Sequence, residues 1–207
     1  WQSAIRNIAG MRVDEKIWKN RKREDVRRNF DNLYSPHRAW LAEKIIECLG
    51  DSCPDDRDLL EIGSGWGPNL ITLAKENKSF RLTGVYISSA SVTEGKAYLN
   101  ENGIEGVELF RGQCDNLSFL KSKSADVVFT DALLMYIGTD KIHKVMHEMD
   151  RIARKKICLL ELHLNGIKDR YTRDGWIRDY KELFSKLVHK DSITFTKLPL
   201  DVRNSGR

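Results

Sequence analysis

The sequence lacks long apolar runs, and its cysteines do not have the spacing of a metal site or a disulfide framework. No stretch of its 207 residues approaches the roughly 18 uncharged apolar residues of a membrane helix, so no membrane span is expected. Arg6 and Arg12 interrupt the first apolar residues, which argues against a signal peptide and favours a cytoplasmic protein. The four cysteines form no CxxC pair, so neither zinc nor a disulfide framework is predicted.

The formal net charge is +5, and much of the excess lies near the start of the chain, between Lys16 and Arg28. Acidic residues such as Glu24 and Asp25 are interleaved there, which is typical of a solvated helix face. An acidic substrate, a nucleic acid or an anionic membrane surface would also suit this segment. Charge alone does not choose among these interpretations.

Residues 1–50 show apolar side chains at roughly helical spacing, which predicts an N-terminal helical cap. Ser35 and Pro36 are typical of a helix start, with Ser35 as N-cap and Pro36 at the first helical position. The turn-rich residues 50–56 then predict a connector to a second unit, residues 51–207.

Beyond the connector, short apolar runs alternate with helical patterns. Several runs, such as Asp126–Phe129 and Ile157–Leu160, are apolar without alternation, as strands buried on both faces must be. This predicts an α/β fold with a doubly wound, mainly parallel sheet and helices on both faces. The expected strands are Asp58–Ile62, Leu82–Ile87, Val107–Phe110, Ala125–Phe129, Ile157–Leu162 and Ile193–Lys197. The expected helices are Leu70–Glu76, Val92–Asn100, Ile142–Ile152 and Trp176–Leu187.

The segment Glu61–Gly67 is a glycine-rich turn between a buried strand and a helix that begins near Pro68. Glycines there allow positive φ and let a ligand approach the backbone, and the helix start favours an anionic group. A dinucleotide fingerprint needs its third glycine at position 68, which is Pro68, so a nicotinamide oxidoreductase is disfavoured. No Gly-Lys-Ser/Thr comes after the turn, which excludes a Walker loop.

The E-x-G-x-G-x-G pattern instead resembles motif I of class I methyltransferases. The resemblance covers residues 59–163 and continues, in order, through Gly84–Ser88, Gly112–Leu117 and Asp126–Ile137. It implies a Rossmann-like domain that binds S-adenosylmethionine, with strand order 3-2-1-4-5-7-6. Six or seven strands are expected, because Leu200–Arg207 is too short and polar for a convincing seventh.

By resemblance, the cofactor would lie along the carboxyl ends of the strands. The glycine turn would hold its methionine half, the end of the second strand its ribose, and the segment after the third strand its adenine. These positions are Glu61, Gly63, Ser64, Gly65 and Gly67 for the methionine half, Tyr86 and Ile87 for the ribose, Gln113 and Cys114 for the adenine, and Thr130 beside the substrate entrance.

Two positions depart from the family pattern. Tyr86 stands where the family has a ribose-binding acid, and a phenol cannot accept two hydroxyl hydrogen bonds as a carboxylate does. Gln113 replaces the usual Asp beside adenine, but its amide oxygen can still accept from the adenine amino group.

Methyl transfer from a sulfonium needs mainly alignment, so no catalytic dyad need be visible. Asp131, after the fourth strand, and His163, after the fifth, are the catalytic candidates. His163 could act as a general base, or be a strand-end histidine with no catalytic role. His37, Tyr34 and Arg38 could close over the cofactor from the N-terminal cap, or serve packing or surface roles instead. No metal site is predicted, because the spacing of the acids after strands four and five fits Mg²⁺ poorly.

Aromatic residues offer a further prediction about the pocket. Four of them could line a substrate site, although an aromatic at helical spacing is more often part of the core. They are Trp18, Phe30, Trp66 and Trp176.

The segment after strand four gives the main constraint on the acceptor. Residues 130–133 lack the [D/N/S]-P-P-[Y/F/W] motif of enzymes that methylate nucleic-acid amino groups, so a nucleic-acid partner is not expected. The leading hypothesis is O-methylation of a small molecule or sugar-type metabolite, with an acidic one favoured by the basic cap. The alternatives are an RNA or protein methyltransferase, or a non-catalytic interaction module with this fold.

Overall fold

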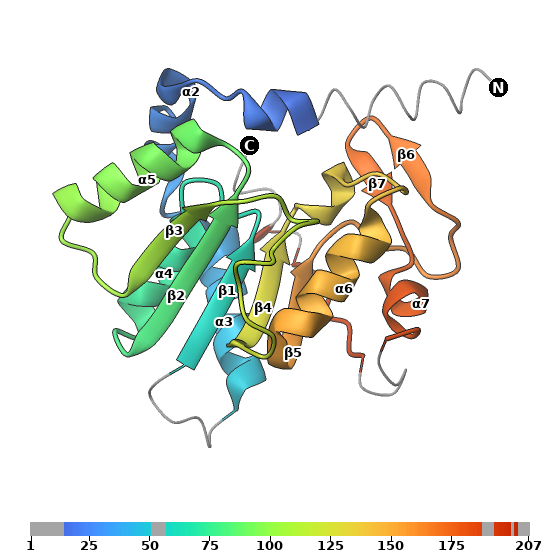
Figure 1. Cartoon of the computed structure of the whole chain (residues 1–207). Helices are drawn as coiled ribbons and strands as arrows, with labels where there is room; N and C mark the ends of the chain where they lie inside the picture. The colour runs from blue at the N-terminus through green and yellow to red at the C-terminus, as the bar shows by residue number, and fades with distance from the viewer. Residues whose placement is uncertain (1–14, 51–56, 188–192, 200, 203–207) are drawn as a thin grey trace.

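The computed structural model describes residues 15–50, 57–187, 193–199 and 201–202. A five-stranded sheet with the order β3-β2-β1-β4-β5 forms its centre, and every neighbouring pair is parallel. Figure 1 shows the strands side by side, with helices in front of and behind them. The strands are β1 Arg57–Ile62, β2 Phe80–Tyr86, β3 Val107–Arg111, β4 Ala125–Asp131 and β5 Ala153–Leu160.

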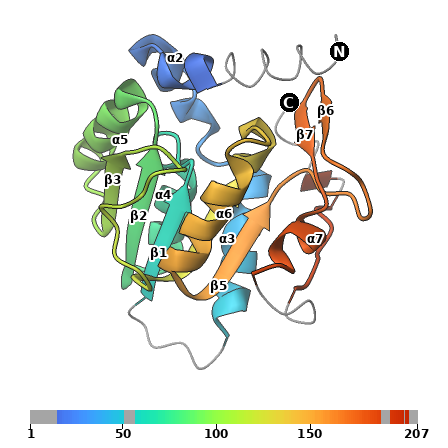
Figure 2. The ribbon, with the colours of Figure 1, turned by 45° about the vertical axis from the view of Figure 1, so that its right-hand side comes forward.

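Helices cover both faces of the sheet. Figure 2 separates the two layers, with α6 in front of the strands and α3 behind them. The helices on one face are α3 Pro36–Leu49, α4 Pro68–Glu76 and α5 Ser89–Glu101, and those on the other are α6 Ile142–Ile152 and the short α7 Tyr180–Phe184. No helix among the described residues is long and apolar enough to cross a bilayer.

Alternate residues of one strand pack into the two apolar layers, one on each face of the sheet. Leu59 packs with the α3, α4 and α5 side of the core, whereas Leu60 and Ile62 pack with the α6 side. Successive strand residues point to opposite faces, so a strand between two layers must be apolar throughout. The predicted doubly wound fold and the order 3-2-1-4-5 are therefore confirmed.

The C-terminal part differs from the expectation. Ile193–Lys197, expected as the sixth strand, forms no strand; its residues are mostly exposed, and the Phe195 ring stacks on His163 at 4.4 Å instead of joining β5. The helix expected at Trp176–Leu187 is shorter, because Trp176 lies in a hairpin of β6 Arg170–Thr172 and β7 Gly175–Ile177. The Arg173-Asp174-Gly175 turn, with φ of +123° at Gly175, is the local signal for that hairpin. Most of the proposed seventh-strand segment lies outside the described residues.

The described part of the N-terminal cap consists of helices joined by short turns. Residues 15–19 are helical, and α2 Arg23–Arg27 and the 3₁₀ helix η1 Phe30–Asn32 lead into α3. Pro36 is the first residue of α3, as predicted, although the Ser35 side chain makes no capping hydrogen bond to the helix backbone. Figure 1 shows α2 above the upper end of the sheet, which is the carboxyl end of its strands. The cap is thus placed beside the edge where parallel sheets bind ligands.

Candidate functional site

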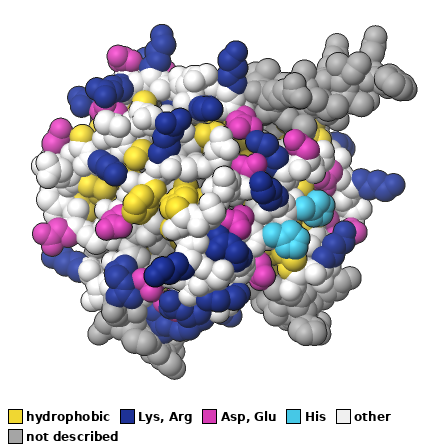
Figure 3. Space-filling model, viewed as in Figure 1, with side chains coloured by type: hydrophobic (Ala, Val, Ile, Leu, Met, Phe, Trp, Pro, Cys, Tyr) yellow, Lys and Arg dark blue, Asp and Glu magenta, His cyan; other side chains and the backbone are white. Residues whose placement is uncertain are grey.

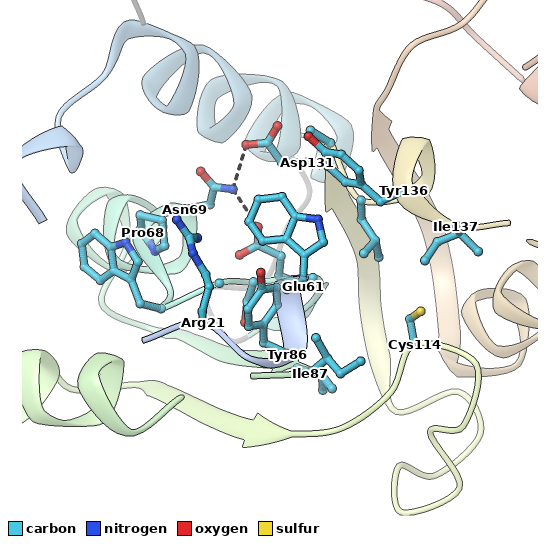
Figure 4. Close-up of a pocket in the computed structure, with 18 of the residues that line it drawn as sticks. Arg21, Glu61, Pro68, Asn69, Tyr86, Ile87, Cys114, Asp131, Tyr136 and Ile137 are labelled. Carbon is cyan, nitrogen blue, oxygen red and sulfur yellow. Dashed lines mark hydrogen bonds between the residues drawn. The ribbon is translucent and has the colours of Figure 1, made fainter. Parts of the chain in front are cut away.

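A pocket of about 1240 Å³ lies at the carboxyl ends of the strands, beneath the N-terminal cap. Ligand sites typically enclose roughly 300–1,000 Å³, so this one has room for a cofactor and an acceptor together. Its walls come from the glycine turn after β1, the end of β2, the loops after β3 and β4, and residues of the cap. Figure 4 shows side chains from these separate segments converging on one space.

The glycine turn exposes backbone to the pocket. Gly63 and Gly65 adopt φ of +88° and +60°, which L-residues with a side chain rarely adopt. The Gly63 and Ser64 amides donate to the Val85 carbonyl at 2.8 and 3.2 Å, which fixes the turn to the end of β2. A Cβ built on Gly65 would meet no atom within 4 Å, so a ligand can approach the backbone there.

Glu61 forms the floor of the pocket and is 1% exposed. Its Oε1 accepts a hydrogen bond from Asn69 Nδ2 at 2.7 Å. Burial raises the pKa of Glu61 to about 8; the Asn69 hydrogen bond and the charge of Arg38 oppose this, and the charge of Asp131 adds to it. Among the described residues, no donor reaches Glu61 Oε2 or Asn69 Oδ1. Two buried acceptors are therefore available to a ligand that carries donors.

A chain of polar contacts continues from Asn69 to the cap. Asn69 Nδ2 also donates to Asp131 Oδ2 at 3.1 Å, and His37 Nε2 lies 3.3 Å from the same oxygen. His37 Nδ1 lies 2.9 Å from Ser35 Oγ. A carboxylate beside Nε2 assigns the proton to that nitrogen, which leaves Nδ1 as the acceptor. This arrangement is that of a general base oriented by a carboxylate.

The positions expected to hold the nucleoside lie on the opposite wall. Tyr86, Ile87, Gln113 and Cys114 all line the pocket. Burial raises the pKa of Tyr86 to about 12, although Arg21 of the cap donates a hydrogen bond to its hydroxyl. Burial likewise raises the pKa of the Cys114 thiol to about 12, so this group stays neutral at physiological pH.

The cap reaches across the pocket and contacts its far wall. Lys141, which precedes α6, pairs with Glu15 at 2.8 Å. The ring of Trp18 lies 5.2 Å from that of Tyr136, and the Arg21 guanidinium lies over Trp18 at 5.0 Å. The pocket is therefore closed on one side by a segment distant in sequence from the sheet.

Most of the residues singled out from the sequence meet at this pocket. Those that line it are Glu61, Gly63, Ser64, Gly65, Tyr86, Ile87, Gln113, Cys114 and Asp131. Trp18 and Trp66 line it as well, whereas Phe30 packs on Trp66 at 4.5 Å and Trp176 packs against Arg178.

Three of the predicted cofactor-binding and catalytic residues do not line the pocket. Gly67 is the N-cap of α4, where an added Cβ would approach the Leu109 side chain to 3.2 Å. Thr130 is fully buried and donates its hydroxyl to Glu161 at 2.8 Å.

His163 is the third, and its placement corrects the expectation that it lies at the site. Its Nδ1 accepts from the Tyr180 amide at 3.1 Å, and its Nε2 lies 2.9 Å from Asn165 Oδ1. Strand β5 ends at Leu160, and the chain then turns so that His163 bridges to Arg178 rather than entering the pocket.

Sequence reasoning gave no role to Asn69 and expected Ser35 only to cap a helix. It left His37 with no role more specific than closing over the cofactor. Asn69 lies two residues after the glycine turn, so its place on the first turn of α4 was an available signal. The contact of His37 with Asp131 has no local signal, because the two residues are 94 positions apart and meet only through the packing of α3 against α4 and β5.

Comparison with known proteins finds a family-model match over just under half of the chain. The family model described as "Methyltransferase domain" matches residues 59–156, from β1 into β5. A tRNA (guanine-N(7)-)-methyltransferase from Christiangramia forsetii is 26% identical over 96 residues, which is 44% of this chain and 43% of the relative. The chain thus matches less than half the length of this curated relative.

Solved structures share the fold at low identity. A protein from Methanococcus maripaludis, described as an S-adenosyl-L-methionine-dependent methyltransferase, has a TM-score of 0.57 and 18% identity over 68% of this chain and 66% of its own. The YcgJ protein from Bacillus subtilis has a TM-score of 0.55 and 16% identity, covering 68% of this chain and 65% of its own. The [4+2]-cyclase SpnF has a TM-score of 0.58 and 18% identity over 72% of this chain and 54% of its own. These likenesses show the fold, which alone does not decide the reaction.

Proposed function

We propose that the chain carries a class I, S-adenosylmethionine-dependent methyltransferase domain and that it methylates a hydroxyl group of an uncharged small molecule or sugar. The observation that carries the proposal is the pair of unsatisfied acceptors on the pocket floor, Glu61 Oε2 and Asn69 Oδ1. The amino-acid end of S-adenosylmethionine presents an ammonium group with three donors and no acceptor. An ammonium there would satisfy both oxygens and lower the cost of ionising Glu61.

The rest of the cofactor is assigned to the pocket walls. The Gly63–Gly65 backbone would receive the methionine half, Tyr86 and Ile87 the ribose, and Gln113 and Cys114 the adenine. Gly67 and Thr130 would contribute indirectly, without lining the pocket. Gly67 would do so as the N-cap of α4, and Thr130 through its hydrogen bond to Glu161. When bound, S-adenosylmethionine supplies a methyl group on a positively charged sulfur, so the protein's main task is alignment.

His37 and Asp131 are the residues proposed to receive the acceptor's proton. A hydroxyl is a poor nucleophile until its proton is removed, so a base is useful for O-methylation. Asp131 beside Nε2 fixes the tautomer and leaves Nδ1 with its lone pair, which now faces Ser35. A bound acceptor would replace the Ser35 hydroxyl or pass its proton through it.

The charges of the described pocket lining argue against the acidic acceptor that the basic cap suggested. The acids are Glu15, Asp31, Glu61, Asp115, Asp131 and Asp140, and the bases are Arg21, Arg38 and Lys141. Even without Glu61, whose pKa is raised to about 8, five acids outnumber three bases and repel an anion, and Lys141 is already paired with Glu15. A sulfonium cofactor of net positive charge and a neutral acceptor suit this lining.

Calorimetry with S-adenosylhomocysteine and S-adenosylmethionine tests the cofactor assignment. We expect saturable binding at micromolar concentration, with one ligand per chain. No heat at millimolar ligand would contradict it and favour a non-catalytic module. Methyl-labelled S-adenosylmethionine with a panel of neutral hydroxylated metabolites then tests the acceptor class. His37→Ala should abolish most label transfer while retaining the affinity for S-adenosylhomocysteine.

A second candidate acceptor is tRNA, favoured by the relative from Christiangramia forsetii. The acidic pocket lining and the absence of the [D/N/S]-P-P-[Y/F/W] motif weigh against it. Binding to phosphate backbones weakens steeply with salt, so tRNA is titrated at 50 and 200 mM salt. For about six phosphate contacts, the affinity for tRNA should differ by about 10³-fold between the two concentrations. Label transfer to tRNA rather than to metabolites would replace the small-molecule proposal.

A further inference from the structure

We propose that Glu161 and Arg178 are positioning residues that clamp the loop after β4, residues 132–138, into the shape that forms one wall of the pocket. The inference rests on the proposed function in assigning that wall to the methyl-transfer site. Residues of this loop line the pocket, among them Leu133, Tyr136 and Ile137. The two clamp residues come from segments beyond β5 and are not part of the pocket lining.

Glu161 holds the first half of the loop. Its Oε1 accepts from the amides of Leu133 and Leu134, both at 2.9 Å, and from the Thr130 hydroxyl at 2.8 Å. Its Oε2 accepts from the Met135 amide at 3.2 Å. These three amides begin the 3₁₀ helix η2 Leu134–Tyr136, whose first N–H groups have no partner within the helix. One carboxylate therefore satisfies the whole amino-terminal side of η2.

Arg178 holds the second half of the loop and is 0% exposed. Its Nη1 donates to the Leu134 carbonyl at 2.7 Å, and its Nη2 donates to the Ile137 carbonyl at 2.5 Å. Its Nε pairs with Asp169 at 2.9 Å, which supplies the counter-charge. A buried guanidinium is costly unless its donors are satisfied, so the observed geometry fixes where both carbonyls must lie.

The clamped loop is strained and contacts both other walls of the pocket. Ala132 has φ of +51°, a left-handed conformation that an alanine rarely adopts and that persists only when its surroundings impose it. The Leu133 side chain lies 3.0 Å from where a Cβ on Gly63 would stand. Tyr136 contacts Trp18 of the cap. A shift of this loop would therefore disturb the glycine turn and the cap at once.

The β6–β7 hairpin explains how Arg178 reaches the loop. A Cβ on Gly175 would approach the Met135 carbonyl to 2.7 Å, so β7 lies directly against η2. Arg178 comes immediately after β7 and enters the core from there. The start of the segment that was expected to form a helix, Trp176–Leu187, therefore belongs to a hairpin that supports the pocket wall.

Hydrogen exchange of the Leu133, Leu134 and Met135 amides tests the clamp without any ligand. In Glu161→Gln we expect their protection to fall at least tenfold, because a Gln side chain offers one acceptor oxygen where the carboxylate offers two. The matched control is Asp126→Asn, which removes a buried carboxylate at the other end of β4. It should lower global stability and leave protection of the three amides, relative to the core, unchanged.

Calorimetry with S-adenosylhomocysteine supplies the second readout. Glu161→Gln and Arg178→Met should each weaken binding about tenfold, and Asp126→Asn less than twofold; Arg178→Lys replaces the Met variant if that one does not fold. The clamp is refuted if Glu161→Gln leaves the three amides protected, or if Asp126→Asn loosens them equally. Wild-type protein that binds no cofactor would overturn the proposed function, while the exchange result would still decide the clamp.

The pH dependence separates a clamp from a passive contact. Burial raises the pKa of Glu161 to about 7, although its four hydrogen bonds oppose this. Tyr180 of α7 faces it, with a pKa that burial and the Glu161 charge raise and that Arg178 opposes. Protection of the three amides should therefore fall as pH drops through about 7, and His163→Asn should keep that response. A flat profile in the wild type would contradict the assignment.

Discussion

The strand starts form one end of the sheet, here called the amino edge, and the strand ends form the other, the carboxyl edge. Each carries a buried acid, and the pKa values of the two acids are shifted in opposite directions. At the amino edge, Asp126 of β4 accepts from the Asp58 amide at 3.2 Å, from Arg154 at 3.0 Å and from Arg57 at 3.4 Å. Burial opposes its ionisation, but these bonds and that of Lys155 outweigh it and lower its pKa. Figure 3 shows Lys and Arg side chains gathered toward this lower end of the face.

At the carboxyl edge, Glu61 of β1 is equally buried but has one oxygen without a donor among the described residues, and its pKa is raised to about 8. Both acids lie on central strands, β1 and β4, which pair directly with each other. The difference is therefore not burial but whether the fold itself supplies the partners. A satisfied acid stabilises the fold, and an unsatisfied one is held ready for a ligand.

The largest effect is expected at the amino edge. Asp126→Asn removes the counter-charge of Arg57, which is 7% exposed, and should lower the free energy of unfolding by about 3 kcal/mol. Urea denaturation measures it. Affinity for S-adenosylhomocysteine should stay within twofold of wild type, and a parallel loss of affinity would erase the distinction between the edges.

The reverse is expected for Glu61→Gln. Loss of a charged acceptor for the ligand's ammonium should weaken S-adenosylhomocysteine binding roughly 10–100-fold, about 1.4–2.8 kcal/mol. The free energy of unfolding should not fall, because the costly buried carboxylate is gone. Calorimetry and urea denaturation of the same variant give both numbers. A destabilised variant with normal affinity would assign Glu61 to the fold.

The pH response of Glu61 has a defined sign. The raised pKa means that the folded chain keeps a proton which the unfolded chain releases near pH 4.5. This contribution to stability is complete below pH 4.5 and is lost as pH rises through about 8. The free energy of unfolding of the wild type, minus that of Glu61→Gln, should therefore decline across that window. Thermal unfolding at a series of pH values measures this difference. A difference that grew with pH would mean that Glu61 is ionised at lower pH than its burial implies.

Two glycines with the same backbone offer a smaller and cleaner comparison. Gly65 and Gly103 have φ of +60° and +59°, and a Cβ on either meets nothing within 4 Å. Ala at either position should cost roughly 1–2 kcal/mol of stability. Only Gly65→Ala should also weaken S-adenosylhomocysteine binding, by about tenfold, because only its methyl group enters the pocket. Equal affinities in the two variants would remove the glycine turn from the binding site.

The smallest effect concerns Tyr86. Tyr86→Asp restores an acceptor for ribose hydroxyls and a partner for Arg21, and should tighten S-adenosylhomocysteine binding by about three- to tenfold. Tyr86→Phe, which removes only the hydroxyl, is the control and should change affinity less than threefold. Weaker binding by the Asp variant would show that the ribose lies elsewhere.

Five strands and the floor of the pocket could be predicted from the sequence. Apolar runs such as Val127–Phe129 can only be strands between two layers, and Glu61 with the three glycines forms a local pattern that needs no distant contact. The hairpin at Arg170–Ile177 was not predicted, because Trp176 and Ile177 also fit a helical spacing. The local signal for it is the turn at Arg173-Asp174-Gly175. His163 was misplaced because strand ends alone do not say where the chain turns next.

By itself, the sequence determined which segments form buried strands and where the glycine turn after β1 lies, because side-chain periodicity and the sterics of positive φ act within a few residues. The order of the strands in the sheet was implied only by the resemblance to class I methyltransferases. Only the tertiary structure decided which buried oxygens stay unsatisfied, that His37 meets Asp131, and that Glu161 and Arg178 hold the wall beside them. Those properties depend on packing between segments tens of residues apart, where partners compete for the same polar atoms, and no local pattern records the outcome.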